Sequence, residues 1–236
     1  MSPSRKLAAA AGVCFFVTHV ASIGGLVLYG PVLGDPGYVA GPGSDTRVLL
    51  GAFFEVLLAL SVVGTALALH PVVKRYGAGA AAGYLGLRTL EAAVICVGIV
   101  SLLAVVTLRR EPAPGADPSA LLAAAQALVA VHDWTFLLGP NFVLGANTVL
   151  VASLLYRSRL VPRPIAALGL AGGPLIFVSA TAVLFGAYGQ LSVWGSLAAL
   201  PVFAWELALA AWLTVKGFRP EGRPAGVGAA ASDCLQ

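Results

Sequence analysis

The sequence contains little charge. Charged residues make up 10% of its 236 residues, compared with about 25% in soluble globular domains, and 59% of the residues are hydrophobic. Because so few charged side chains cannot cover a water-exposed surface, this composition excludes an ordinary soluble globule. Cysteine is also scarce, and three positions (Cys14, Cys96 and Cys234) do not make the disulfide framework of a small secreted protein. The composition therefore predicts an integral membrane protein with free thiols.

Motifs that would identify a reaction are also missing. The sequence has no HExxH-type metal-ligand spacing, no aspartate-rich diphosphate motif and no nucleophile elbow, so we predict neither a metal site nor a cofactor. The net charge of +4 comes from 14 basic residues, which in so apolar a chain are topology signals rather than a phosphate-binding stripe. Nucleic acid is therefore not an expected partner.

Apolar stretches long enough to cross a bilayer, about 20 residues each, fill most of the chain. We expect six spans, at about residues 7–32, 48–70, 79–108, 136–156, 164–188 and 193–215. An Ala-rich outer segment from residue 118 precedes the fourth span, and Pro140 allows a kink near its start. The predicted fold class is all-α, a polytopic bundle of six transmembrane helices over residues 1–217, followed by a disordered cytoplasmic tail over 218–236.

Basic residues are distributed unevenly between the two ends of these spans. Only three lie on the presumed outer side (Arg47, Arg109 and Arg110), and ten lie on the other: Arg5, Lys6, Lys74, Arg75, Arg157, Arg159, Arg163, Lys216, Arg219 and Arg223. The positive-inside rule then places both termini in the cytoplasm. Arginine-rich, alanine-rich composition hints at a GC-rich bacterial genome, so the expected location is the bacterial cytoplasmic membrane.

Arg88 is the one basic residue inside a predicted span. A charge at the bilayer centre costs about 2.5 to 3.5 kcal/mol on insertion scales, so Arg88 should face the bundle interior and find partners. Glu91 and Tyr84 share its helical face. Counted at about 1.5 Å per residue, several polar residues of other spans reach overlapping depths and predict an acidic pocket in the outer half of the bundle. These residues are His19, Glu55, Asn141, Asn147 and Glu206, with His132 and Asp133 near the outer interface.

Carboxylates in this pocket are the candidate catalytic groups, namely Glu206, Glu91 and Glu55. The candidate ligand contacts are Arg88, His19, His132, Asp133, Asn141, Asn147, Tyr84 and Trp205. We expect Arg88 to pair with a carboxylate from another helix, Glu55 or Glu206, as well as with Glu91, because one partner cannot satisfy a guanidinium with five donors. One carboxylate should then stay free of Arg88 and act as proton donor, and Glu206 is the first choice because its own helix offers no nearby cation. The alternative for Arg88 and Glu91 is a purely structural neutralised pair, and for His19 a satisfied core histidine.

The run from Tyr156 through Gly169, Tyr-Arg-Ser-Arg-Leu-Val-Pro-Arg-Pro-Ile-Ala-Ala-Leu-Gly, resembles the inner-loop segment of a bacterial membrane family. That family is known only as a domain of unknown function, DUF4386. Further matching pieces are Gly34-Asp35, Leu87 to Ala92, His132, and Glu206 followed by Leu213 and Lys216-Gly217, so the resemblance covers about residues 5–218. It implies a six-helix bundle and no particular reaction.

Two functions remain open for the predicted pocket. The first is a membrane-embedded enzyme that uses carboxylate acid/base chemistry on a hydrophobic, isoprenoid- or lipid-like small molecule. The alternative is a proton- or cation-coupled transporter or a ligand-binding membrane protein. No inverted repeat or pair of broken helices favours transport, although Pro140 and Pro201 could each break a helix. Membrane lipids and a hydrophobic small molecule are the expected partners.

Overall fold

The fold is all-α. The computed structural model describes residues 2–41, 44–112, 115 and 117–220, so most of the predicted tail lies outside the described residues. Within these residues, six helical segments are long and apolar enough to cross a membrane, which confirms the predicted fold class. The helices are α1 (Pro3–Leu28), α2 (Gly30–Gly34), α3 (Asp45–Val73), α4 (Ala78–Arg110), α5 (Pro118–Leu137), α6 (Leu144–Ser158), α7 (Arg163–Leu184) and α8 (Val193–Val215).

The fourth span differs from its prediction. Helices α5 and α6 form one segment of 41 residues, Pro118–Ser158, joined by a π-helical turn over Leu138–Val143 rather than broken in two. Pro140 has no N–H to donate to the carbonyl of Phe136, and the side-chain amide of Asn141 donates to that carbonyl at 3.0 Å instead. The helix therefore continues through the proline because a neighbouring side chain satisfies the freed carbonyl.

At the end of the first span, too, a side chain satisfies a carbonyl that a proline leaves without a donor. We predicted a single helix to about residue 32, but α1 ends at Leu28 and the short α2 begins at Gly30. Pro31 cannot donate to the carbonyl of Val27, which accepts from the Arg47 guanidinium at 3.3 Å. A proline thus separates α1 from α2, and a basic side chain from α3 satisfies the carbonyl left free.

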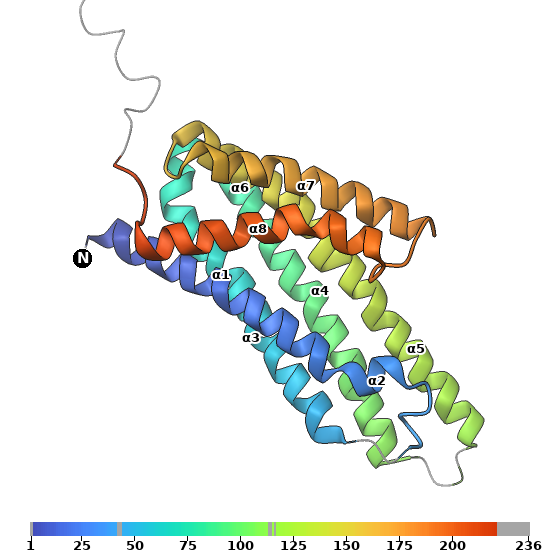
Figure 1. The fold of residues 1–236 in the computed structure, drawn as a ribbon. Coiled ribbons are helices and arrows are strands. Elements are labelled where there is room, and N and C mark those ends of the chain that lie inside the picture. The colour runs from blue at the N-terminus through green and yellow to red at the C-terminus, as the bar shows by residue number, and fades with distance from the viewer. Residues whose placement is uncertain (1, 42–43, 113–114, 116, 221–236) are drawn as a thin grey trace, which may run out of the picture.

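The helices pack as two groups, one around α3 and α4 and the other around α7. In one group α1 packs on α3, and α4 contacts α3 and α5; in the other, α7 packs between α6 and α8. Contacts of α1 with α8 and of α4 with α6 join the groups. Figure 1 shows the helices close together near the N-terminus, while the α7–α8 hairpin diverges from α1, α3, α4 and α5 toward the other end.

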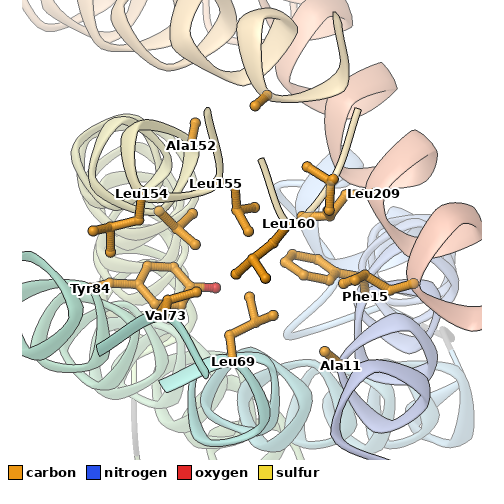
Figure 2. Close-up of a cluster of buried hydrophobic side chains, with 14 of the residues drawn as sticks. Ala11, Phe15, Leu69, Val73, Tyr84, Ala152, Leu154, Leu155, Leu160 and Leu209 are labelled. Carbon is orange, nitrogen blue, oxygen red and sulfur yellow. The ribbon is translucent and has the colours of Figure 1, made fainter. Parts of the chain in front are cut away.

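A dense apolar cluster closes the bundle near the termini. Figure 2 shows Leu160, from the loop between α6 and α7, pointing in among Phe15, Leu69 and Leu209. Leu160 is 2% exposed, and its carbonyl accepts a hydrogen bond from the backbone N–H of Arg219 at 2.8 Å. Burying a leucine side chain contributes about 1.5 to 3 kcal/mol, so this loop is held inside the bundle by its own apolar residues.

The start of α1 is tied to the end of α8 by Arg5. Its guanidinium donates to three of the last carbonyls of α8, those of Leu213, Thr214 and Val215, at 2.8, 2.6 and 3.1 Å. Such carbonyls have no partner within their helix, and a cation there also favours the helix dipole.

Replacing Arg5 with alanine is expected to lower the free energy of unfolding by about 1 to 2 kcal/mol, since three charge-assisted hydrogen bonds are lost at a partly exposed site. Reversible unfolding in mixed micelles measures this change. The neighbouring Lys6→Ala is the matched control, because Lys6 is exposed. Equal losses in the two variants would contradict a specific capping role for Arg5.

The opposite end of the bundle is covered by the segment between α2 and α3. Asp45 accepts from the Tyr38 hydroxyl at 3.0 Å and from Arg110 at 2.8 Å, and lies 3.3 Å from Arg109. Arg109 also donates to the carbonyl of Gly41 at 2.9 Å and stacks on the Tyr38 ring. Burial and the hydrogen bond to Asp45 raise the pKa of Tyr38, so the phenol remains a donor. These contacts fix the connecting segment against the end of α4.

Candidate functional site

A pocket of about 460 Å³ lies inside the bundle where the two helix groups diverge. Its walls come from α1, α3, α4, α5 and α8, with further residues from α6, α7 and the segment before α8. This volume falls within the range of about 300 to 1,000 Å³ that is typical of small-molecule sites. Most lining residues are apolar, and the ionisable ones are His19, Glu55, Arg88, Glu91, His132, Asp133 and Glu206.

Arg88 is the centre of one polar cluster in this pocket. It is 1% exposed, and its guanidinium donates to Oε1 of Glu206 at 2.6 Å and to Oε2 of Glu91 at 3.4 Å. The side-chain amide of Asn147 donates to the same Glu91 oxygen at 2.7 Å. Three helices, α4, α6 and α8, are thereby joined through one buried ion-pair network.

This network corrects the expectation for Glu206. We expected a carboxylate from another helix, Glu55 or Glu206, to pair with Arg88 in addition to Glu91, and Glu206 does so at 2.6 Å, which confirms that expectation. We also expected Glu206 to be the carboxylate that stays free of the arginine, and that expectation is wrong. An i,i+3 partner on α4 cannot satisfy a guanidinium with five donors, and α8 packs close enough to supply the second carboxylate. His19 completes this side: its Nδ1 lies 2.8 Å from the carbonyl of Phe15, and its Nε2 lies 3.9 Å from Oε2 of Glu206.

Glu55 belongs to a second polar cluster with His132, Tyr29 and Asp133. His132 lies between two carboxylates, with Nε2 3.8 Å from Oε1 of Glu55 and Nδ1 3.5 Å from Oδ1 of Asp133. The rings of His132 and Tyr29 meet edge to face, with centroids 5.5 Å apart. The Tyr29 hydroxyl and His132 Nδ1 are buried without a hydrogen-bond partner in the part of the chain that the structure describes. Unpartnered buried polar atoms beside a cavity are typical of a ligand-binding or catalytic site.

Two glycines bring α1 and α3 close together beside this cluster. A Cβ atom on Gly25 would lie 3.1 Å from Cγ of Glu55, and one on Gly51 would lie 2.7 Å from the Tyr29 ring. Each glycine is four residues from the functional side chain on its own helix, so Gly25 with Tyr29 and Gly51 with Glu55 form two facing pairs. Sequence analysis missed Tyr29, and this glycine spacing is the signal that could have found it.

The structure separates the predicted site residues into two sets. Most of them line the pocket: His19, Glu55, Arg88, Glu91, His132, Asp133, Asn141 and Glu206. Three other predicted ligand contacts, Tyr84, Asn147 and Trp205, are not among the described residues that line the pocket. The Tyr84 hydroxyl lies 3.3 Å from the Thr65 hydroxyl, and the side-chain amide of Asn147 donates a hydrogen bond to Glu91 at 2.7 Å. Trp205 is fully buried because Gly169 leaves space for its indole ring.

Potential metal ligands occur in this pocket only as pairs. Within the described ranges, no group of three or more His, Cys, Asp or Glu side chains is placed to hold a metal ion. Glu55 with His132, and His132 with Asp133, are instead spaced so that a small approach would let a proton pass between them. The arrangement is thus suited to binding a polar group and moving a proton.

Comparisons with known proteins identify a family but no activity. No curated protein and no solved structure matches the chain. A family model described as Domain of unknown function (DUF4386) matches residues 10–217, which include all six membrane-spanning segments of the described chain apart from the first residues of α1. The protein is therefore a multi-pass integral membrane protein, and it belongs to the DUF4386 family.

Proposed function

We propose that this protein is an intramembrane enzyme that transfers a proton to or from a hydrophobic small molecule, isoprenoid- or lipid-like, held in the central pocket. The observation that carries the proposal is the Glu55–His132 pair, which faces the cavity and is not engaged by Arg88. Bound molecules would be membrane-derived, because the outer surfaces of the helices are apolar and contact lipid.

The distance between Glu55 and His132 supports acid/base chemistry. At 3.8 Å, the carboxylate and imidazole can exchange a proton after a small approach or through one water molecule. A positioned acid or base of this kind contributes about 10² to 10⁴ in rate. In this proposal Glu55 and His132 contact the substrate, whereas Glu91 and Glu206 position the pocket wall through Arg88.

Asp133 offers a route by which the protonation of Glu55 can be reset. Its side chain is 66% exposed, while that of Glu55 is 13% exposed, and His132 lies between them. An imidazole can accept a proton on one nitrogen and release it from the other, so it is suited to relay protons between the two carboxylates.

Transport is the second candidate, since a row of ionisable groups from Asp133 to Glu206 would also suit a proton- or cation-coupled transporter. The apolar cluster around Leu160 argues against it, because this cluster lies between the pocket and the end of the bundle near the termini. A continuous path through the bundle would require Leu160, Phe15 and Leu209 to separate.

We also propose that the termini face the cytoplasm of a bacterial cell and that the pocket lies in the outer half of its membrane. The helix bounds support this orientation, since Lys74, Arg157 and Lys216 lie at helix ends on the side of the N-terminus, whereas Arg109 and Arg110 end α4 on the other side. Residues 1–217 then form the transmembrane domain, and 218–236 a cytoplasmic tail.

Deuterium exchange tests the proposed reaction. The purified protein, reconstituted in vesicles in heavy water, is incubated with prenyl alcohols of increasing length and with a bacterial lipid extract. We expect one class of molecule to gain carbon-bound deuterium, detected by mass spectrometry, because Glu55 and His132 exchange protons with solvent. His132→Phe should abolish the gain, and Glu111→Gln, at an exposed position, should not. If cations or protons cross the vesicle membrane through the protein and no molecule gains carbon-bound deuterium, the result would instead favour the transporter.

A further inference from the structure

We infer that the molecule bound in this pocket carries a positive charge at the Glu55 end and is a hydrophobic amine in its ammonium form. This inference rests on the proposed small-molecule function of the pocket and adds the chemical class of the ligand. When a proton leaves the Glu55 carboxyl group and bonds to a neutral ligand, the products are a ligand cation and a Glu55 carboxylate. When a proton instead leaves the bound ammonium form and bonds to the Glu55 carboxylate, the products are a neutral ligand and the Glu55 carboxyl group, so the inference agrees with transfer in either direction.

The formal charge of the pocket favours a cation. Its lining contains four carboxyl groups, from Glu55, Glu91, Asp133 and Glu206, against the single guanidinium of Arg88. Ionised, these groups sum to −3, and to −1 if both lining histidines are protonated. Low-dielectric walls strengthen the electric field of this excess negative charge inside the cavity, so a positively charged ligand is attracted and an anionic one is repelled.

Glu55 is the carboxyl group that a ligand cation would meet. Arg88 is already shared between Glu206 and Glu91, at 2.6 and 3.4 Å, so neither of these needs a further cation. The shortest ion-pair contact of Glu55 within the described chain is His132 at 3.8 Å, beyond hydrogen-bonding distance. A buried carboxylate in this position gains most from a donor that arrives with the ligand.

Aromatic side chains elsewhere in the pocket, and Tyr29 beside Glu55, add features that suit an ammonium ion. Tyr29 places a buried hydroxyl beside Glu55 that makes no hydrogen bond of ordinary geometry within the described residues, and its oxygen can accept from an ammonium N–H. The rings of Tyr29, Phe136 and Phe203 line the same pocket, and aromatic faces attract cations. Apolar residues such as Leu58 and Ile95 form much of the remaining wall, which suits a hydrophobic body rather than a hydrated metal ion.

An acidic headgroup fits this site poorly. A fatty acid or phosphate would need a free cation, and Arg88 has no terminal nitrogen left without a carboxylate partner. Binding such an anion would require breaking the contact to Glu206 and would place two negative groups together in the pocket.

Three ligands with one hydrocarbon cage and different polar groups test the inference on the unmodified protein: 1-adamantylamine, 1-adamantanol and 1-adamantanecarboxylate. Affinities are measured by calorimetry in a neutral maltoside detergent near neutral pH. We expect the amine to bind at least tenfold more tightly than the alcohol, and the carboxylate to bind least. Glu55→Gln and, in part, Tyr29→Phe should remove the preference for the amine. Glu111→Gln, at the exposed end of α4, should preserve it.

The possible failures are distinguishable. Equal binding of the three ligands, or tighter binding of the carboxylate, would overturn the inferred charge and leave a hydrophobic pocket. The proposed function itself would be overturned by two results together: none of the three ligands binds, and Ala199→Trp, which fills the pocket, leaves deuterium exchange unchanged. Because the ligand series needs no variant, a folding defect in Glu55→Gln does not weaken the test.

Discussion

Replacing Arg88 with leucine is expected to lower the free energy of unfolding by about 3 to 5 kcal/mol, the usual cost of breaking a buried ion pair from one side. The variant leaves Glu206 and Glu91 buried without their shared cation, and three helices lose their common polar contact. Unfolding in mixed micelles, followed by circular dichroism or tryptophan fluorescence, measures the loss.

A compensated variant separates the charge from the packing. Combining Arg88→Leu with Glu91→Gln and Glu206→Gln should recover much of the lost stability, since no unpaired charge remains in the bundle. Arg110→Leu is the control, because Arg110 also pairs with a carboxylate but its side chain is 51% exposed. Exposed pairs contribute only about 0 to 1 kcal/mol. If Arg88→Leu and Arg110→Leu cost the same, the Arg88 network does not hold the bundle together.

Replacing Glu55 with glutamine is expected to lower the rate of the proposed proton transfer by about 10² to 10⁴, while the free energy of unfolding stays nearly unchanged. The two side chains have similar shapes, and Glu55 makes no contact with Arg88 that the variant would break. Glu206→Gln should mainly lower the free energy of unfolding, because it removes the carboxylate that lies 2.6 Å from Arg88. The deuterium-exchange assay and micelle unfolding measure the two effects.

A chemical label can distinguish Glu55 from Glu206 without a substrate. Dicyclohexylcarbodiimide is hydrophobic and reacts with carboxyl groups in apolar surroundings, so we expect it to modify Glu55 and to spare Glu206, which its ion pair protects. Peptide mass spectrometry locates the adduct. Preferential labelling of Glu206, or an activity loss equal in Glu55→Gln and Glu206→Gln, would transfer the catalytic role back to Glu206.

The segment that carries the family resemblance also has a structural explanation. Sequence analysis treated Tyr156 through Gly169 as an inner loop, and such loops are usually exposed. Here Leu160 and Val161 turn inward and are almost completely buried, while Arg157, Arg159 and Arg163 remain exposed. The basic residues of this loop therefore mark its side of the membrane, while its apolar residues close the bundle. Hydropathy averaged over a long window does not reveal the second role.

The sequence by itself determined the parts of this protein that depend on local composition. Runs of apolar residues fix the number and approximate bounds of the spans, because only helices satisfy their own backbone hydrogen bonds in lipid. The same logic singled out Arg88, since one buried charge requires partners, and it correctly placed Glu91 on the same helical face.

Only the tertiary structure decided which carboxylates those partners are. Glu206 is 118 residues from Arg88 in the sequence, and Glu55 is 77 residues from His132, so no periodicity within one helix relates them. Their meeting depends on the rotation and closeness of the helices, which side-chain packing between helices decides; Gly25 and Gly51, for example, allow the close approach of α1 and α3 that brings Tyr29 and Glu55 to the same place. Equal depth along separate helices is compatible with many rotations about their axes. Packing selects one of them, and it leaves Glu55 rather than Glu206 free of the arginine.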